Sequence, residues 1–387
     1  MDSRQGLPYW RLSAFYAAYF ALLGGFAPFW GLYLKDIGFS GSEIGQLMAI
    51  FMATRLVAPN LWGWLADKRK RRLGIIRLGA LLSCLTLVLL WWARDFWQMA
   101  LAMMVFTFFL NAVLPQFEVV TLQYLGLKRA RYSQIRLWGS LGFVAIVVLV
   151  GWALKLWSIQ GLPLLLVGLG VLMVCSTWLV QEPRAELESA QAGASFWARL
   201  AVPQVWLFYF IFMLAQISHG PFNTFYSIFM EEQGFDSLQI GGLWAVGVVA
   251  EILVFIGMHR LMRWGVARLM LWALAITVLR WLLVAAYPGW LPLVLFTQLM
   301  HAATFGIMHA CGVHLVQQFF SGGNEGQGQA LFSSFSYGVG GALGALLSGY
   351  VWQHWGHGES FAVAAVVALL AWLLAWRGLR NLSSDSE

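Results

Sequence analysis

The chain has 387 residues, of which 60% are hydrophobic and only 11% are charged, and its mean hydropathy is +0.72. This composition excludes a soluble globular domain and indicates a protein that crosses a membrane many times. The net charge of +7 does not indicate a nucleic-acid partner, because the basic residues concentrate in loops on one side of the predicted spans.

Twelve apolar runs are long enough to cross a bilayer as helices, and they lack the alternation expected of membrane β-strands. They cover residues 10–34, 43–66, 73–93, 96–125, 133–156, 160–180, 204–230, 239–262, 267–287, 290–319, 328–353 and 359–379. We therefore expect an all-α membrane protein with twelve transmembrane helices. A polar linker, 181–204, divides them into six-helix bundles at 1–180 and 205–387.

The distribution of Lys and Arg over the loops predicts the orientation. The basic side includes the loop at 68–72, whereas Lys35, Arg94 and Lys155 are the only basic residues on the other side. By the positive-inside rule, both termini are cytoplasmic. We expect a monomer in a bacterial-type cytoplasmic (inner) membrane, with the lipid bilayer, a small-molecule substrate and protons as its partners.

The two halves show a weak internal repeat. Pro28 and Tyr33 in the first run correspond to Pro221 and Tyr226 in the seventh. At a slightly different offset, Arg55 in the second run aligns with Glu251 in the eighth, so each half carries a charge inside the membrane. Parallel six-helix repeats are a transporter architecture, with the substrate site near the midplane. The halves are therefore expected to be pseudo-symmetric bundles.

Several ionisable side chains lie deep inside these runs. Glu118 in run 96–125 and Arg136 in run 133–156 are separated by a short turn, which makes the two runs antiparallel neighbours. A charge at membrane depth needs a partner or a water-filled cavity, and it marks a substrate or proton pathway by default. We expect Glu118, Arg136, Arg55 and Arg280 to contact substrate. The alternative is that they form structural ion pairs.

Run 290–319 carries three histidines. His301, Phe305 and His309 are spaced four residues apart and share a helix face, while His314 points elsewhere. Because histidine titrates near neutral pH, we expect a proton relay among Glu251, His301 and His309, with Glu118 as a further proton carrier. Interhelical hydrogen bonding is the simpler alternative for these histidines.

Run 204–230 places polar side chains along one stripe that Gly220-Pro221 interrupts. A proline within a helix permits bending, so this helix can act as a gate that also touches substrate. Trp138 lies near the expected cavity and can stack on an aromatic substrate. Gly340, Gly344 and Ser348 are predicted to allow close helix packing. The polar stripe consists of Gln216, His219, Asn223 and Tyr226.

The loop GWLADKRKRR at 63–72 resembles the loop between helices 2 and 3 of the major facilitator superfamily, with Gly63, Asp67 and the basic residues Lys68 and Arg71. It departs by carrying Lys70 where the family often has Gly. Asp67 can accept hydrogen bonds from helix N-termini or from arginines across the interface between the halves, and so control conformation. The alternative is a plain basic loop that sets orientation.

Two narrower resemblances follow. The first rests on the segments YSQIRLWGS at 132–140, GVVAE at 247–251, LRW at 279–281 and QLMH at 298–301. These segments resemble the 3-phenylpropionate permease branch of the superfamily. The arrangement of charges is also similar to lactose permease, a proton–sugar symporter. That resemblance implies substrate binding by Glu118 and Arg136 and proton coupling by Glu251, Arg280 and His301. The chain departs by lacking a carboxylate after His301 in the same helix.

We therefore expect a secondary active transporter, not an enzyme, that works by alternating access. The expected activity is proton-coupled uptake of a small organic solute such as an aromatic carboxylate. The alternatives are a proton-coupled exporter of drugs or metabolites and a sugar or nucleoside symporter. No P-loop motif or metal-ligand spacing occurs, so no cofactor and no metal are expected.

Overall fold

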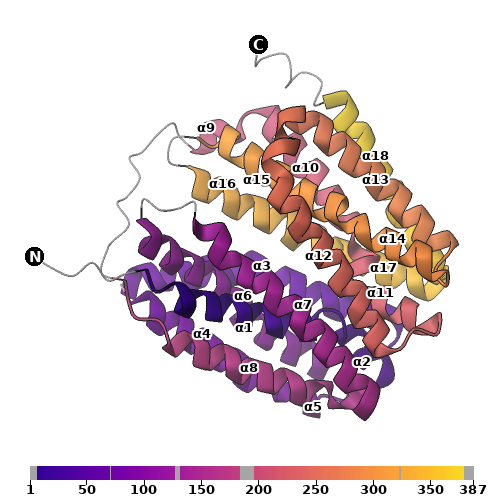
Figure 1. Ribbon diagram of the computed structural model, residues 1–387, viewed down its shortest axis with the longest axis horizontal. Coiled ribbons are helices and arrows are strands. Elements are labelled where there is room, and N and C mark those ends of the chain that lie inside the picture. Colours follow the sequence, from indigo (N-terminus) through magenta and orange to yellow (C-terminus); the bar gives the residue numbers. More distant parts are fainter. Residues whose placement is uncertain (1–6, 70, 127–130, 184–195, 322–323, 379–387) are drawn as a thin grey trace, which may run out of the picture. The chain divides into compact units, whose positions relative to one another are not determined.

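The computed structural model describes residues 7–69, 71–126, 131–183, 196–321 and 324–378, and all regular elements among them are helical (Figure 1). The two termini and most of the predicted linker 181–204 lie outside the described residues. So does Lys70, where the loop at 63–72 departs from the family pattern.

The predicted membrane spans are confirmed. Among the described residues, 12 helical segments are long and apolar enough to cross a membrane. Their limits differ from the predicted ones by less than one helical turn. They are Tyr9–Asp36, Gly41–Arg69, Arg72–Trp92, Phe96–Leu125, Tyr132–Trp157, Ile159–Trp178, Pro203–Glu232, Ser237–Trp264, Val266–Ala286, Leu291–Phe319, Glu325–His354 and His357–Gly378.

The chain forms two compact units. Unit 1 comprises Met1–Gly38, Thr54–Glu188 and Ser237–Ala245, and unit 2 comprises Phe39–Ala53, Ser189–Asp236 and Val246–Glu387. Helices α3 (Gly41–Arg69) and α12 (Ser237–Leu261) each contribute one part to each unit.

Unit 1 otherwise contains α1 (Tyr9–Phe26), α2 (Trp30–Asp36), α4 (Arg72–Leu87), α5 (Leu89–Trp92), α6 (Phe96–Leu125), α7 (Tyr132–Trp157), η2 (Ile159–Gly161) and α8 (Leu162–Trp178). Small residues allow α1 and α7 to pack closely. A Cβ atom on Gly24 would lie 2.9 Å from the carbonyl oxygen of Phe143, and Gly142 has no room for a side chain against Ala17. Within a membrane, such close backbone approach supplies packing that hydrophobicity alone cannot.

Unit 2 contains α9 (Phe196–Leu200), α10 (Pro203–Ser218), α11 (Gly220–Glu232), η3 (Met262–Trp264), α13 (Val266–Ala286), α14 (Leu291–Leu299), η4 (Ala302–Ile307), α15 (Met308–Phe319), α16 (Glu325–Phe332), η5 (Ser333–Gly340), α17 (Gly341–His354) and α18 (His357–Gly378). The predicted close packing of Gly340 and Gly344 is confirmed. Gly340 faces the backbone of Met213, and Gly344 faces the backbone of Ile217.

The helices are interrupted at the predicted hinge of the seventh span, at the corresponding place in the first span, and elsewhere. The first span breaks between α1 and α2, around Pro28, and the seventh breaks at His219, just before Gly220-Pro221. In addition, η4 and η5 are π-helical turns within the tenth and eleventh spans. Such turns are rare and frequently lie at functional sites.

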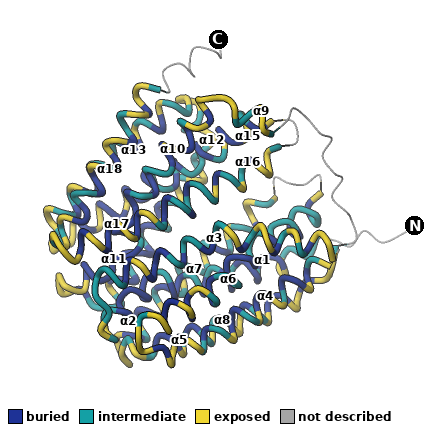
Figure 2. Tube along the Cα trace, turned by 180° about the vertical axis from the view of Figure 1, so that it is seen from behind, coloured by how far each residue is buried: buried dark blue, intermediate teal, exposed yellow. Residues whose placement is uncertain are grey.

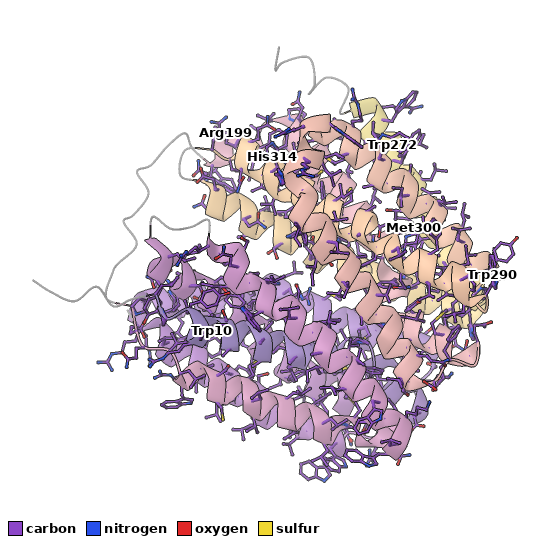
Figure 3. All side chains as sticks on the ribbon, viewed as in Figure 1. Trp10, Arg199, Trp272, Trp290, Met300 and His314 are labelled. Atoms are coloured by element: carbon purple, nitrogen blue, oxygen red, sulfur yellow. The ribbon has the colours of Figure 1, made fainter. Side chains whose placement is uncertain are left out.

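The exposed surface is rich in large apolar side chains, as expected of helices that face lipid. Trp272 is 62% exposed and Trp290 is 61% exposed, and both project outward from unit 2 (Figure 3). Buried positions line the inner faces of the helices within each unit (Figure 2). The chain is therefore a multi-pass membrane protein.

Candidate functional site

Glu118 in unit 1 receives a hydrogen bond from a tyrosine rather than an ion pair from Arg136. The Tyr132 hydroxyl, at the start of α7, donates to Oε1 of Glu118 on α6 at 2.9 Å. Tyr16 on α1 packs edge-on against Tyr132 and donates to Thr121 Oγ1 at 3.1 Å. Within the described part of the chain, no ion pair joins Glu118 to Arg136. The carboxyl is thus held by a neutral donor.

Arg136 lies one turn further along α7 and packs on aromatic rings of α1. Its guanidinium carbon is 3.8 Å from the ring centre of Phe20 and 5.9 Å from that of Tyr16. Such contacts stabilise a cation without neutralising it. Arg136 therefore lies near Glu118 without bonding to it.

Tyr19 on α1 lies near three of the predicted charges of unit 1. Its hydroxyl, which donates to Leu110 O at 3.5 Å, lies within electrostatic reach of Arg55, Glu118 and Arg136. Arg55 follows Thr54 on α3. The Thr54 hydroxyl forms buried hydrogen bonds with Thr107 and Asn111 of α6. Three of the predicted charges therefore share one region of unit 1.

In unit 2, Arg280 on α13 joins residues that the sequence placed on separate helices. Its Nη1 donates to Thr304 Oγ1 at 2.9 Å and to His301 Nδ1 at 3.2 Å. Because arginine can only donate, Nδ1 of His301 accepts, and a neutral ring carries its proton on Nε2. That nitrogen is 3.7 Å from Glu251 Oε2. Arg280, His301 and Glu251 therefore lie in a row, which forms a polar chain across three helices.

Aromatic rings enclose Arg280. Its guanidinium carbon is 4.4 Å from the ring centre of Phe222 and 4.6 Å from that of Trp281. The ring of His219 meets Trp281 edge-on at 5.0 Å, and Phe222 packs against Tyr226 at 4.9 Å. The predicted stripe residues His219 and Tyr226 are therefore close to the predicted cation Arg280.

Further along the tenth span, the two predicted histidines and Phe305 form a stack of rings, as their spacing predicts. The ring centres of His301 and Phe305 are 5.3 Å apart, and those of Phe305 and His309 are 6.2 Å apart. His309 Nδ1 lies 2.7 Å from the Tyr337 hydroxyl in η5. His314 is exposed. The stack extends from Glu251 toward Tyr337.

Two predicted substrate contacts lie at the margins of these clusters. Trp138 donates from Nε1 to the Tyr9 hydroxyl at 3.0 Å and packs edge-on against Trp10, so it joins the start of α1. Asn223 lies on α11 one residue after Phe222 and is half-buried. Among the described residues, neither side chain forms a hydrogen bond or a ring contact with the charged groups described above.

Most of the predicted loop at 63–72 is helical: Gly63 to Arg69 form the last turns of α3, and Arg72 begins α4. Asp67 pairs with Arg72 at the start of α4, and Arg72 also donates to Gln116 on α6. Asp67 near the end of α3 is thus paired with the first residue of the next helix. Beside it, Gly63 faces Gln116, Lys68 lies over Trp64, and Arg71 is the exposed N-cap of α4.

Sequence reasoning assigned no role to Tyr132, Thr304, Phe222 or Trp281. Some signal was present: Thr304 follows His301 by one turn, and Trp281 is adjacent to Arg280. Neither pattern shows which side chain bonds to which, because those bonds join different helices.

The model of the MFS_1 like family matches residues 9–363. A probable 3-phenylpropionic acid transporter of Escherichia coli is 30% identical over 369 residues, 93% of this chain and 95% of the relative. The maltose permease of Geobacillus stearothermophilus is 24% identical over 93% of this chain and 92% of the permease.

Among solved structures, the crystal structure of the nucleoside transporter NupG is similar with a TM-score of 0.82 and 18% identity. The match covers 96% of this chain and 98% of that chain. A bacterial homolog of the human lysosomal transporter Spinster is similar with a TM-score of 0.77 and 14% identity, over 98% of each chain. At these identities the likeness concerns the fold.

Proposed function

Because the chain belongs to the MFS_1 like family, we propose that it is a proton-coupled symporter that takes up a small organic anion, such as an aromatic carboxylate, by alternating access. Its relatives are transporters of small solutes, which supports secondary transport of a small solute by this chain. The resemblance to a probable 3-phenylpropionic acid transporter supports the aromatic carboxylate.

The observation that carries the proposal is the polar chain from Arg280 through His301 to Glu251. Buried ionisable groups are costly in a membrane and are found mainly where ions or protons move. Here a cation, a titratable imidazole and a titratable carboxyl lie one after another in space, as Arg280, His301 and Glu251. Such an arrangement can bind an anion at one end and exchange a proton at the other.

We propose that Glu118 and its donor Tyr132 serve the same cycle in unit 1, with Arg136 and Arg55 supplying positive charge nearby. We also propose an inner-membrane location with cytoplasmic termini, on the basis of the basic loops. Under this orientation, the stack from His301 to His309 runs toward the cytoplasm, which is the direction that proton release during uptake requires.

The test is transport by the purified chain in proteoliposomes. An imposed inward proton gradient should drive accumulation of labelled 3-phenylpropionate, and an ionophore that collapses the gradient should abolish it. An imposed sodium gradient of the same size serves as the control. A rate that does not change when the proton gradient collapses would exclude coupling to protons.

A sugar or nucleoside symporter is the second candidate, because the relatives include a maltose permease and a nucleoside permease. Competition separates the two. Under the first proposal, unlabelled aromatic acids should inhibit uptake of labelled 3-phenylpropionate, and unlabelled maltose or nucleosides should not. Under the second proposal, the chain should take up labelled maltose or nucleoside, and the unlabelled form of the same solute should inhibit that uptake. An exporter would instead accumulate the solute in vesicles of inverted orientation.

A further inference from the structure

Arg280 uses only one side of its guanidinium. The residue is 0% exposed, and its Nη1 donates to Thr304 and His301. Its Nε and Nη2 are also buried, but neither has a hydrogen-bond partner. One side of the group is therefore anchored, while the other holds two unused donors.

This arrangement is unfavourable for folding alone. A buried donor without a partner costs about 1–3 kcal/mol, and more when the group is charged. Among the described residues, no carboxylate forms an ion pair with Arg280. Arg136, in contrast, lies within electrostatic reach of Glu118. Of these two arginines, Arg280 is the one whose charge is left without a carboxylate.

The unused donors are a matched pair. Nε–H and Nη2–H lie on the same edge of a planar guanidinium and point in parallel, so that they fit the two oxygens of one carboxylate. We infer that this edge of Arg280 binds the carboxylate of the transported anion in a bidentate manner. The inference rests on the proposed function and deepens it, because it assigns the anion to one arginine.

The surroundings favour an aromatic acid. Phe222 and Trp281 present ring faces to the guanidinium, and Tyr226 packs beside Phe222. A substrate ring attached to the carboxylate through a short spacer would meet these faces. A neutral amide offers one acceptor oxygen where a carboxylate offers two, so it would leave one of the donors without its partner, which is a ground for discrimination.

The fold also supplies a way to uncover the edge. Phe222 is the third residue of α11, directly after the break at His219 and Gly220-Pro221. Because the break interrupts the helix, α11 can bend relative to α10 and lift Phe222 from Arg280. Trp281 is adjacent to Arg280 on α13 and stays with it.

The experiment measures binding to the purified full-length chain in detergent. The probes are 3-phenylpropionate and its neutral isostere 3-phenylpropanamide, and the readout is tryptophan fluorescence. We expect the wild type to prefer the carboxylate. Arg280→Lys keeps the charge but lacks the paired edge, and it should weaken carboxylate binding by about tenfold or more while binding of the amide changes little.

A matched control is Arg77→Lys. Arg77 also packs on a tryptophan, with its guanidinium carbon 4.5 Å from the ring centre of Trp178, and it also has a buried Nε without a partner. Its Nη2, however, donates to Val180 O at 2.8 Å, so it lacks a free pair of donors. This variant should retain the preference for the carboxylate.

If Arg280→Lys does not fold, Thr304→Val provides the second variant, because it removes an anchor of Nη1 and leaves the charge in place. It should reduce the preference for the carboxylate several-fold. The inference is overturned if the wild type binds amide and carboxylate equally well. It is also overturned if Arg136→Lys loses carboxylate binding while a folded Arg280→Lys retains it.

These outcomes separate the inference from the proposed function. Binding that depends on Arg280 without proton-driven uptake would contradict the symport proposal alone. Proton-driven uptake with carboxylate binding that is unaffected by Arg280→Lys would contradict the assignment of the anion to Arg280 alone.

Discussion

Arg280 fixes the tautomer of His301. Its Nη1 donates to Nδ1 of the imidazole at 3.2 Å, so that nitrogen must accept and the neutral ring carries its proton on Nε2. Nε2 faces Glu251 Oε2 at 3.7 Å. A cation on one helix thereby directs a proton toward a carboxyl on another.

The first prediction concerns Glu251→Gln, which keeps the size of the side chain but cannot take up or release a proton. In proteoliposomes, uptake of labelled 3-phenylpropionate driven by a proton gradient should fall by roughly 100-fold. Exchange of internal unlabelled substrate for external labelled substrate should continue, because it requires no net proton movement.

Glu231→Gln, at an exposed position near the end of α11, is the control and should transport normally. If Glu251→Gln lowers exchange and gradient-driven uptake to the same extent, Glu251 acts in binding or folding rather than in coupling.

The second prediction concerns Tyr132→Phe, which removes the hydroxyl that donates to Glu118 Oε1. A largely buried carboxyl then loses its hydrogen bond, and the variant should be destabilised by about 1–3 kcal/mol. The measurement is thermal unfolding in detergent, monitored by circular dichroism.

Tyr124→Phe is the matched control, because the Tyr124 hydroxyl donates to Gln181 O at a more exposed site. Its effect should be smaller. Equal melting temperatures for Tyr132→Phe and the wild type would show that the bond to Glu118 contributes no net stability.

The third prediction concerns the start of α11. Gly220 packs directly on the backbone of Gly344 in α17 and has no room for a methyl group. Gly220→Ala should therefore destabilise the protein by about 1–3 kcal/mol through overpacking, as measured by its melting temperature.

Gly168→Ala tests the same chemical change where a Cβ atom meets nothing within 4 Å. Since alanine favours helices over glycine by about 1 kcal/mol, this variant should be unchanged or slightly stabilised. A loss of stability in Gly168→Ala equal to that in Gly220→Ala would argue against steric contact as the cause.

The fourth prediction concerns Glu182, which accepts hydrogen bonds from the backbone N–H groups of Arg72 at 2.8 Å and Leu73 at 3.0 Å. It thus caps α4 from a distant part of the chain and places a negative charge at the helix N-terminus. Glu182→Ala should cost about 1–2 kcal/mol, again measured by thermal unfolding.

Glu182→Gln retains an acceptor oxygen and removes the charge, so it should have an intermediate effect that shrinks as salt is added. If Glu182→Ala lowered the melting temperature less than Glu182→Gln did, a capping role for Glu182 would be contradicted.

The spans and hinges were predictable because the membrane imposes simple rules on the sequence. An apolar run must be about 20 residues long to cross the bilayer, and Pro28 and Pro221 each interrupt a helix by removing a backbone donor. These effects act within one segment, so the sequence of that segment is sufficient to reveal them.

The partner of Glu118 could not be predicted in the same way. Tyr132 and Arg136 lie four residues apart on α7, so they occupy the same face and are alternative donors for a carboxylate on α6. Charge favoured Arg136, but the structure gives the bond to Tyr132 and places Arg136 on Phe20. Which of the two donors reaches Glu118 depends on how far α6 and α7 are shifted along their axes relative to each other, and the sequence does not show this shift.

The π-helical turns η4 and η5 determine whether the stack of rings persists. A π-turn holds one residue more than an α-turn, and converting it would rotate the following residues by about 100°. At η4 this would turn His309 away from Phe305 and Tyr337, while His301, which precedes η4, kept its place. Tyr337 itself lies in η5. If η4 rotated the residues that follow it, η5 would have to rotate Tyr337 to match, because otherwise the hydrogen bond between His309 and Tyr337 would break.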